Sequence, residues 1–180
     1  MVQTARPFTP PKDIIKTYSG PTVVVTAAIA WMSFLASSRR EPVPPDALLG
    51  PMIAMFWLTA LVWLVMVLAR NIAVVRGAAS IQYYTDYHSD VPDERIERPA
   101  RAFNNLMQLP TLFYVVCLLM FVTKRADAAQ VTIAWTFVAF RLLHAAVYVL
   151  FNHVPYRFAF WMGGFLALCF LWFRFGALAP

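Results

Sequence analysis

Charged residues are scarce in this sequence. They make up 13% of its 180 residues, whereas 61% are hydrophobic; an ordinary soluble domain is about a quarter charged and about half apolar. This scarcity excludes a soluble globular domain, because so much apolar surface requires lipid around it. The uncharged residues also form long runs, over 17–38, 47–69, 102–123, 128–140 and 158–173. Each run has the length, or nearly the length, of a helix that crosses a bilayer.

Cysteine is also scarce, and regular alternation of apolar and polar residues is missing. The two cysteines, Cys117 and Cys169, lie inside apolar runs, where cysteine is usually a small packing residue rather than half of a disulfide. A transmembrane barrel would need alternating segments of roughly ten residues, and a run such as MIAMFWLTALVWLVMVLA does not alternate. Because lipid offers the backbone no hydrogen bonds, the sequence predicts α-helices.

The apolar runs predict five transmembrane helices, over residues 21–37, 48–70, 98–122, 129–150 and 155–173. The first resembles the core of a signal peptide, but no small-x-small cleavage site follows it, so we expect a retained helix. The segment 39–50 contains three prolines and is expected to be a linker. Short connections make the last three helices antiparallel neighbours in a bundle.

Basic residues lie at the edges of the apolar runs. The net charge of +6 therefore indicates topology and contact with anionic lipid rather than with nucleic acid. One face of the membrane collects nine basic residues: Arg6, Lys12, Lys16, Arg70, Arg76, Arg95, Arg98, Arg101 and Arg157. The other collects five: Arg39, Arg40, Lys124, Arg125 and Arg174. The first face, with the N-terminus, is expected to be cytoplasmic.

Polar residues inside the third predicted helix recur with helical spacing. Arg98, Arg101, Asn105 and Gln108 follow one another at steps of three, four and three, so one face of a continuous helix would carry them all. Two interpretations remain open: arginines that reach the interface beside amides that hold helices together, or part of a binding site. Pro110 follows, so a kink is expected there.

The fourth predicted helix carries an arginine near its middle. Arg141, His144 and Tyr148 share one face of it. A guanidinium at that depth costs about 2.5–3.5 kcal/mol on insertion scales, so it must face a partner or a water-filled cavity. Either an interhelical hydrogen bond satisfies it, or it belongs to a site for a small anion. Arg157 follows in the first turn of the last helix, and guanidinium groups match carboxylates or phosphates.

Two motifs, taken in order, carry a resemblance to a known family. They are ERPARAFNNLMQ and RLLHAAVYVLFNHVPYR. The pairing of Arg-Ala-x-x-Asn with Arg-x-x-His-x-x-x-Tyr, followed by an Arg nine residues later, resembles the MAPEG superfamily, the membrane-associated proteins in eicosanoid and glutathione metabolism. The resemblance implies an all-α integral membrane fold: a four-helix bundle over residues 47–180, with residues 1–46 as a cytoplasmic segment, an extra transmembrane helix and a proline-rich linker.

The resemblance also implies a site and an assembly. It implies a homotrimer that binds glutathione between neighbouring subunits near the cytoplasmic face, with a small lipophilic substrate arriving from the bilayer. Arg157 matches the arginine that stabilises the glutathione thiolate in catalytic members. A thiol with a pKa of about 8.5 is mostly protonated at neutral pH, and a nearby guanidinium favours its anion. The candidate glutathione-binding residues are Arg70, Arg98, Arg101, Asn105, Gln108, Arg141, His144 and Tyr148.

The sequence leaves more than one function open. The first is a glutathione-dependent transferase or peroxidase acting on lipophilic electrophiles. The second is a non-catalytic accessory subunit that holds a lipid headgroup or a partner helix, with a membrane-protein partner at the N-terminal helix. A small transporter fits poorly because no internal repeat is visible. We expect an integral multi-pass protein of a bacterial inner membrane. Departures from the family pattern favour the second function, and they occur at Asn104, Gln108, Phe158 and Trp161.

Overall fold

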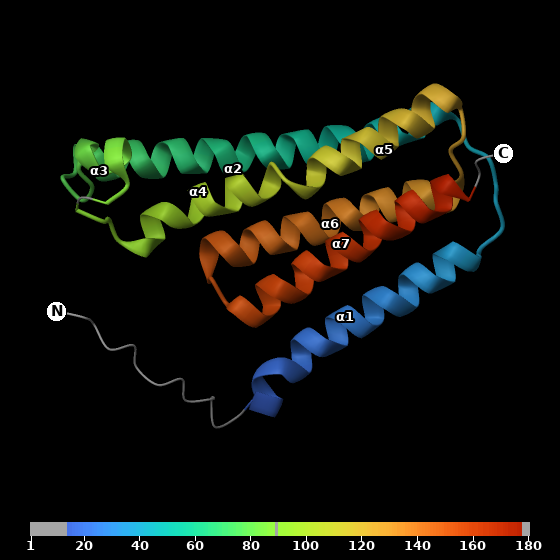
Figure 1. Cartoon of the computed structure of the whole chain (residues 1–180), viewed down its shortest axis with the longest axis horizontal. Helices are drawn as coiled ribbons and strands as arrows, with labels where there is room; N and C mark the ends of the chain where they lie inside the picture. The colour runs from blue at the N-terminus through green and yellow to red at the C-terminus, as the bar shows by residue number, and fades with distance from the viewer. Residues whose placement is uncertain (1–13, 89, 178–180) are drawn as a thin grey trace.

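The computed structural model describes residues 14–88 and 90–177, so Arg6 and Lys12 of the charge count lie outside the described residues. The elements in this part are helices (Figure 1): α1 Ile14–Ser37, the 3₁₀ helix η1 Pro45–Leu48, α2 Leu49–Val75, α3 Ile81–Asp86, α4 Glu94–Leu106, α5 Leu109–Thr123, α6 Ala128–Leu150 and α7 Val154–Gly176. Five segments of the described chain are long and apolar enough to cross a membrane. The predicted fold class and the five spans are therefore confirmed.

The outer surface of the bundle is apolar. Side chains such as Phe56, Trp57 and Phe173 are 57%, 64% and 69% exposed. Contiguous exposed apolar surface marks a contact with a membrane or a partner, and here it covers helices of membrane-spanning length. The protein is an integral, multi-pass membrane protein.

The third span is a broken helix rather than a continuous one. Helix α4 ends at Leu106, and α5 begins at Leu109 with Pro110 in its first turn. Proline has no backbone N–H and restricts the residue before it, so it can begin a helix but interrupts one that is already formed. The expected kink is confirmed as a break at Met107 and Gln108. Gln108 therefore does not continue the polar face of α4.

Helices α6 and α7 form the closely packed centre of the bundle. The turn between them is short, and Pro155 stands at the start of α7, where its missing N–H leaves no hydrogen bond unmade. A Cβ atom on Gly163 would lie 2.6 Å from the ring of Phe140, so this glycine permits the close approach of the two helices. One turn away along α6, Phe113 of α5 stacks on Phe137 with ring centroids 4.6 Å apart.

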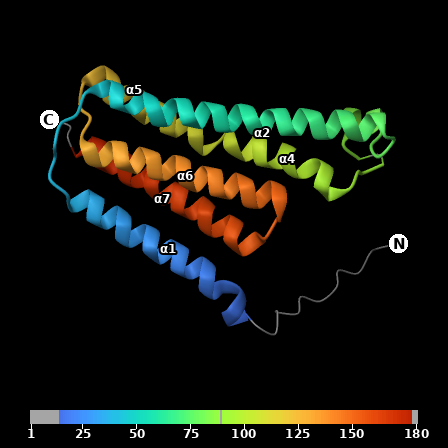
Figure 2. The same ribbon diagram turned by 180° about the vertical axis from the view of Figure 1, so that it is seen from behind.

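Helix α1 packs along α7 and α6, on the side of them that faces away from α2 (Figures 1 and 2). Gly20 lies against the hydroxyl of Tyr156, and Trp31 donates its indole N–H to Thr136 Oγ1 at 3.3 Å. The linker after α1 is also attached, since Val43 N–H donates to the carbonyl of Ala126 at 3.1 Å. The N-terminal span is thus docked on the bundle along its length.

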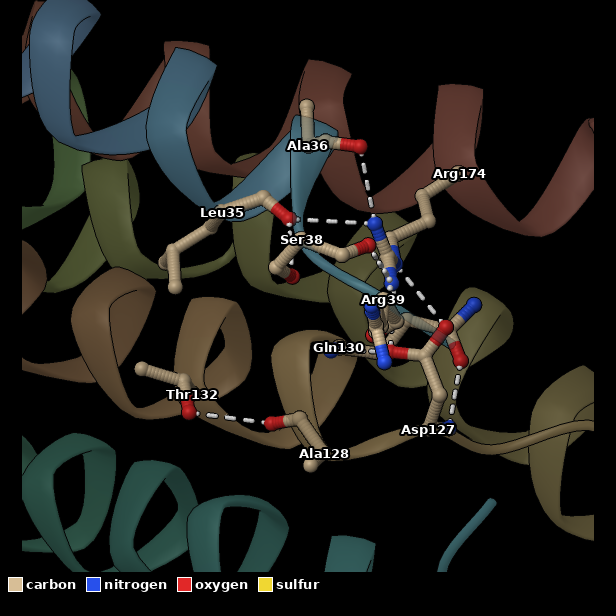
Figure 3. A network of polar contacts seen from close by, with 9 residues as sticks. All are labelled: Leu35, Ala36, Ser38, Arg39, Asp127, Ala128, Gln130, Thr132 and Arg174. Carbon is tan, nitrogen blue, oxygen red and sulfur yellow. Dashed lines mark hydrogen bonds and ion pairs between the residues drawn. The ribbon is translucent and has the colours of Figure 1, made fainter. Parts of the chain in front are cut away.

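A buried ion pair fixes the far end of α1. The Arg174 guanidinium of α7 donates to Asp127 Oδ2 at 2.8 Å, with side chains that are 3% and 5% exposed. Its other nitrogens donate to carbonyl oxygens at and beyond the end of α1 (Figure 3), on Leu35, Ala36, Ser38 and Arg39. Of these, the carbonyls of Leu35 and Ala36 belong to the last turn of α1, where no N–H four residues on continues the helix. Arg174, which the charge count treated as a topology signal, is a structural cation.

Asp127 has a second partner besides Arg174. Its side chain accepts from Gln130 N–H at 2.9 Å, while the Gln130 side chain accepts from Asp127 N–H at 2.8 Å. This capping box satisfies two N–H groups at the start of α6. The Asp127 carboxylate therefore caps the start of α6 and is linked, through Arg174, to the end of α1.

Candidate functional site

A cavity of about 420 Å³ lies among α4, α6 and the start of α7. Its volume falls within the roughly 300–1,000 Å³ of small-molecule pockets. Residues spaced three, four or seven apart share one side of a helix, and this spacing brings two residues of α6 and four of α7 to the same space. The lining residues are Asn105, His144, Tyr148, Val154, Arg157, Phe158 and Trp161.

Arg157 is held on three sides in this cavity. Its Nη1 donates to Asn152 Oδ1 at 2.6 Å. Its guanidinium carbon lies 4.2 Å from the centroid of the Tyr148 ring, a cation–π contact. Its backbone carbonyl lies 2.8 Å from His144 Nδ1. The residue is half-buried, and these contacts restrict the orientation in which the guanidinium faces the cavity.

One ring nitrogen of His144 has no hydrogen-bond partner on the described chain. Because a carbonyl oxygen can only accept, the bond to Arg157 requires the proton on Nδ1. Nε2 is then an acceptor, and within the described residues this buried atom has no hydrogen-bond partner. The ring lines the cavity, but Nε2 itself is covered, so a donor on a bound molecule reaches it only if the side chains that cover it move.

Arg141 lies behind the cavity rather than in its wall. It is fully buried, and its Nη2 donates to the side-chain oxygen of Asn105 at 2.6 Å and to the Asn105 carbonyl at 2.9 Å. The interhelical hydrogen bond that the sequence left open is present at Nη2, while Arg141 Nε and Nη1 have no partner among the described residues. It joins α6 to α4 and fixes the amide of Asn105, which lines the cavity.

The remaining candidates are not in the cavity wall. Arg70 pairs with Glu97 Oε2 at 2.8 Å and stacks on Tyr84 at 5.0 Å, beside a separate cavity of about 350 Å³. Arg98 lies 3.5 Å from Glu94. Two further candidates, Arg101 and Gln108, are exposed on the described chain. One chain therefore brings together Asn105, His144, Tyr148 and Arg157, with Arg141 behind them.

Sequence reasoning missed the partners of the arginines. Glu97 and Glu94 neutralise Arg70 and Arg98, and Asn152 holds Arg157. Glu97 is 7% exposed, and an acidic residue at the start of an apolar span was a visible signal for a buried pair. Asn152 had a weaker signal, because an asparagine after a helix is common for turn geometry alone.

Comparison with known proteins identifies the family. No curated protein and no solved structure matches the chain. The sequence model of the MAPEG family matches residues 54–177, well over half of the chain, from the first turns of α2 to the end of α7. The match contains every cavity residue and leaves α1 outside. The chain belongs to the MAPEG family.

Proposed function

We propose that the protein is a glutathione-dependent membrane transferase or peroxidase that acts on lipophilic electrophiles. The observation that carries the proposal is the cavity in which Asn105, His144, Tyr148 and Arg157 meet. It lies in a chain of a family whose members commonly use glutathione. Non-catalytic members exist in the same family, so the proposal rests on the chemistry of these side chains.

The cavity residues fit a small peptide with carboxylate groups. Apart from Nη1, the guanidinium nitrogens of Arg157 make no hydrogen bond to the described residues, and they match a carboxylate or a thiolate. A buried acceptor without a partner costs about 1–3 kcal/mol, so a shift of the side chains over His144 Nε2 that lets a peptide N–H reach it would be stabilising. Asn105 is an amide of fixed orientation, suited to hydrogen bonds with peptide groups.

Each polar residue of the cavity then has a role in the proposed reaction. Glutathione supplies a thiol, which reacts as its anion. Arg157 provides the positive charge beside that anion, and Tyr148 keeps the guanidinium plane in place. His144 and Asn105 orient the peptide. Phe158 and Trp161 form an apolar wall, with ring centroids 6.4 Å apart, suited to a lipophilic second substrate.

Glutathione binding can be measured without knowing the second substrate. Purified protein in detergent is titrated with glutathione, and the apparent Tm is recorded. A ligand of the folded state raises its stability by about 2.7 kcal/mol at a concentration of 100 times Kd, so a progressive rise in Tm is expected. The same tripeptide with both carboxylates amidated should give a much smaller rise. An unchanged Tm at millimolar glutathione would contradict the proposal.

A second function has one observation in its favour. Glu97 and Glu94 already neutralise Arg70 and Arg98, which leaves fewer free cations for glutathione than the sequence suggests. A non-catalytic subunit that holds a lipid headgroup through Arg157 would need fewer unpaired cations than a glutathione site. In the same titration it would respond to a phosphate headgroup analogue, glycerol 3-phosphate, and not to glutathione.

We also propose an orientation and an assembly. In the described chain the larger basic set lies at the end of the bundle formed by the start of α1, the end of α2 and the starts of α4 and α7. The excess of basic residues supports a cytoplasmic position for this end. Arg101 is exposed and does not line the cavity around Arg157 in its own chain, which supports a homotrimer in which it reaches a neighbouring subunit's site.

A further inference from the structure

An amide bridge connects Arg157 to a carboxylate on another helix. Asn152, in the turn between α6 and α7, accepts from Arg157 Nη1 through its side-chain oxygen at 2.6 Å. Its side-chain nitrogen donates to Glu94 Oε1, on the first residue of α4. Glu94 in turn lies 3.5 Å from Arg98 Nε. The family resemblance pointed to none of the residues between the two arginines.

The backbone of the turn fixes the position of this amide. Asn152 has φ of 50°, the left-handed conformation, and its N–H donates to the carbonyl of Val147 at 2.7 Å. Asparagine is one of the few side chains that tolerate this conformation. The short side chain of a residue fixed in this way can reach Arg157 on one side and Glu94 on the other without further adjustment.

The chemical identity of the bridge determines how much charge Arg157 retains. A carboxylate in direct contact with a guanidinium compensates its charge, whereas a neutral amide only hydrogen-bonds to it. Here the amide stands between Arg157 and the negative charge of Glu94. Glu94 therefore helps to orient Arg157 without contacting it. The delocalised positive charge of the Arg157 guanidinium stays uncompensated by a carboxylate and can stabilise a bound thiolate.

We propose that Asn152 and Glu94 are positioning residues: together they fix the orientation of Arg157 while leaving its charge uncompensated for an anionic guest. This inference rests on the proposed function, and it extends the reaction site to two residues outside the cavity wall. The bridge also joins the start of α4 to the start of α7, so the guanidinium is placed relative to both walls of the cavity.

The variant Asn152→Asp tests whether the neutral charge of the bridge matters to Arg157, apart from the geometry of the bridge. Aspartate has the same shape, tolerates the left-handed backbone and still accepts from Arg157. It cannot donate to Glu94, so a purely structural role predicts a loss of stability with little change in the pKa of the bound thiol. The inference predicts that the pKa of the bound glutathione thiol rises by about one unit or more, roughly a tenfold loss of thiolate at neutral pH. The ultraviolet absorbance of the thiolate against pH measures it. Gln82→Glu, at an exposed position of α3, adds the same charge elsewhere and should leave that pKa unchanged.

Asn152→Gly tests the orientation of Arg157 in protein without ligand. Glycine keeps the backbone conformation and removes the bridge. Nitrogen NMR of the guanidinium, assigned with Arg157→Lys, should show separate Nη signals in the wild type and one averaged signal in Asn152→Gly. Unchanged signals in Asn152→Gly, or an unchanged thiol pKa in Asn152→Asp, would overturn the inference. Failure of wild-type protein to bind glutathione would instead overturn the proposed function, and the NMR comparison would still decide the positioning of Arg157.

Discussion

Arg174→Ala is expected to destabilise the folded protein by about 3–5 kcal/mol, because it removes one partner of a buried ion pair. The substitution leaves the Asp127 carboxylate buried without its cation. It also removes the donors to the carbonyl oxygens at the end of α1. Reversible unfolding in mixed micelles, followed by circular dichroism as the fraction of denaturing detergent rises, measures the loss.

Two other variants show which part of the cluster supplies the stability. Asp127→Asn should lose less, because asparagine still caps α6 and Arg174 keeps its bonds to the α1 carbonyls. Arg40→Ala removes an exposed cation from the same linker region and should change the unfolding free energy by less than about 0.5 kcal/mol. If Arg174→Ala were no more destabilising than Arg40→Ala, the cluster would not anchor α1.

The spans could be predicted because lipid imposes a simple rule on sequence. A helix in the bilayer core tolerates almost no charge, so the uncharged runs marked the helices and the basic residues marked their ends. The break before Pro110 followed from the missing N–H of proline. The docking of α1 did not follow, because it depends on Arg174 and Asp127, which are 47 residues apart. Each alone looked like an ordinary charge at a helix end.

The same limit applies to the cavity. Spacing along a helix predicted which residues share a face, and His144 and Tyr148 do lie together in the wall. Spacing along a helix could not predict which acidic residues lie beside which arginines. Glu94 lies next to Asn152 only because the turn between α6 and α7 ends beside the start of α4. The arginines that looked equivalent in sequence are different in the structure: Arg70 is paired with Glu97, while Arg157 is bonded to a neutral amide.

Arg157→Ala is expected to lower kcat/KM for glutathione and a lipophilic electrophile by roughly 10²–10³-fold, the loss seen when one donor to a developing or reactive anion is removed. Arg157 contributes through its charge, so the bound thiol should return toward its ordinary pKa of about 8.5. In the proposed mechanism the guanidinium lowers that pKa, so wild-type activity should persist to lower pH. The acidic limb of the kcat/KM profile should therefore move to higher pH in the variant.

Two variants make this result specific to the position of Arg157. Arg157→Lys keeps the charge but cannot keep the planar contact with Tyr148, so it should retain part of the pH shift and less of the rate. Arg76→Ala removes an exposed cation at the end of α2 and should leave both quantities unchanged. Activity in Arg157→Ala equal to that of Arg76→Ala, over aryl halides and alkyl hydroperoxides alike, would show that Arg157 does not stabilise the thiolate. The half-buried guanidinium over Tyr148 would then serve binding of an anion without catalysis, as the accessory function requires.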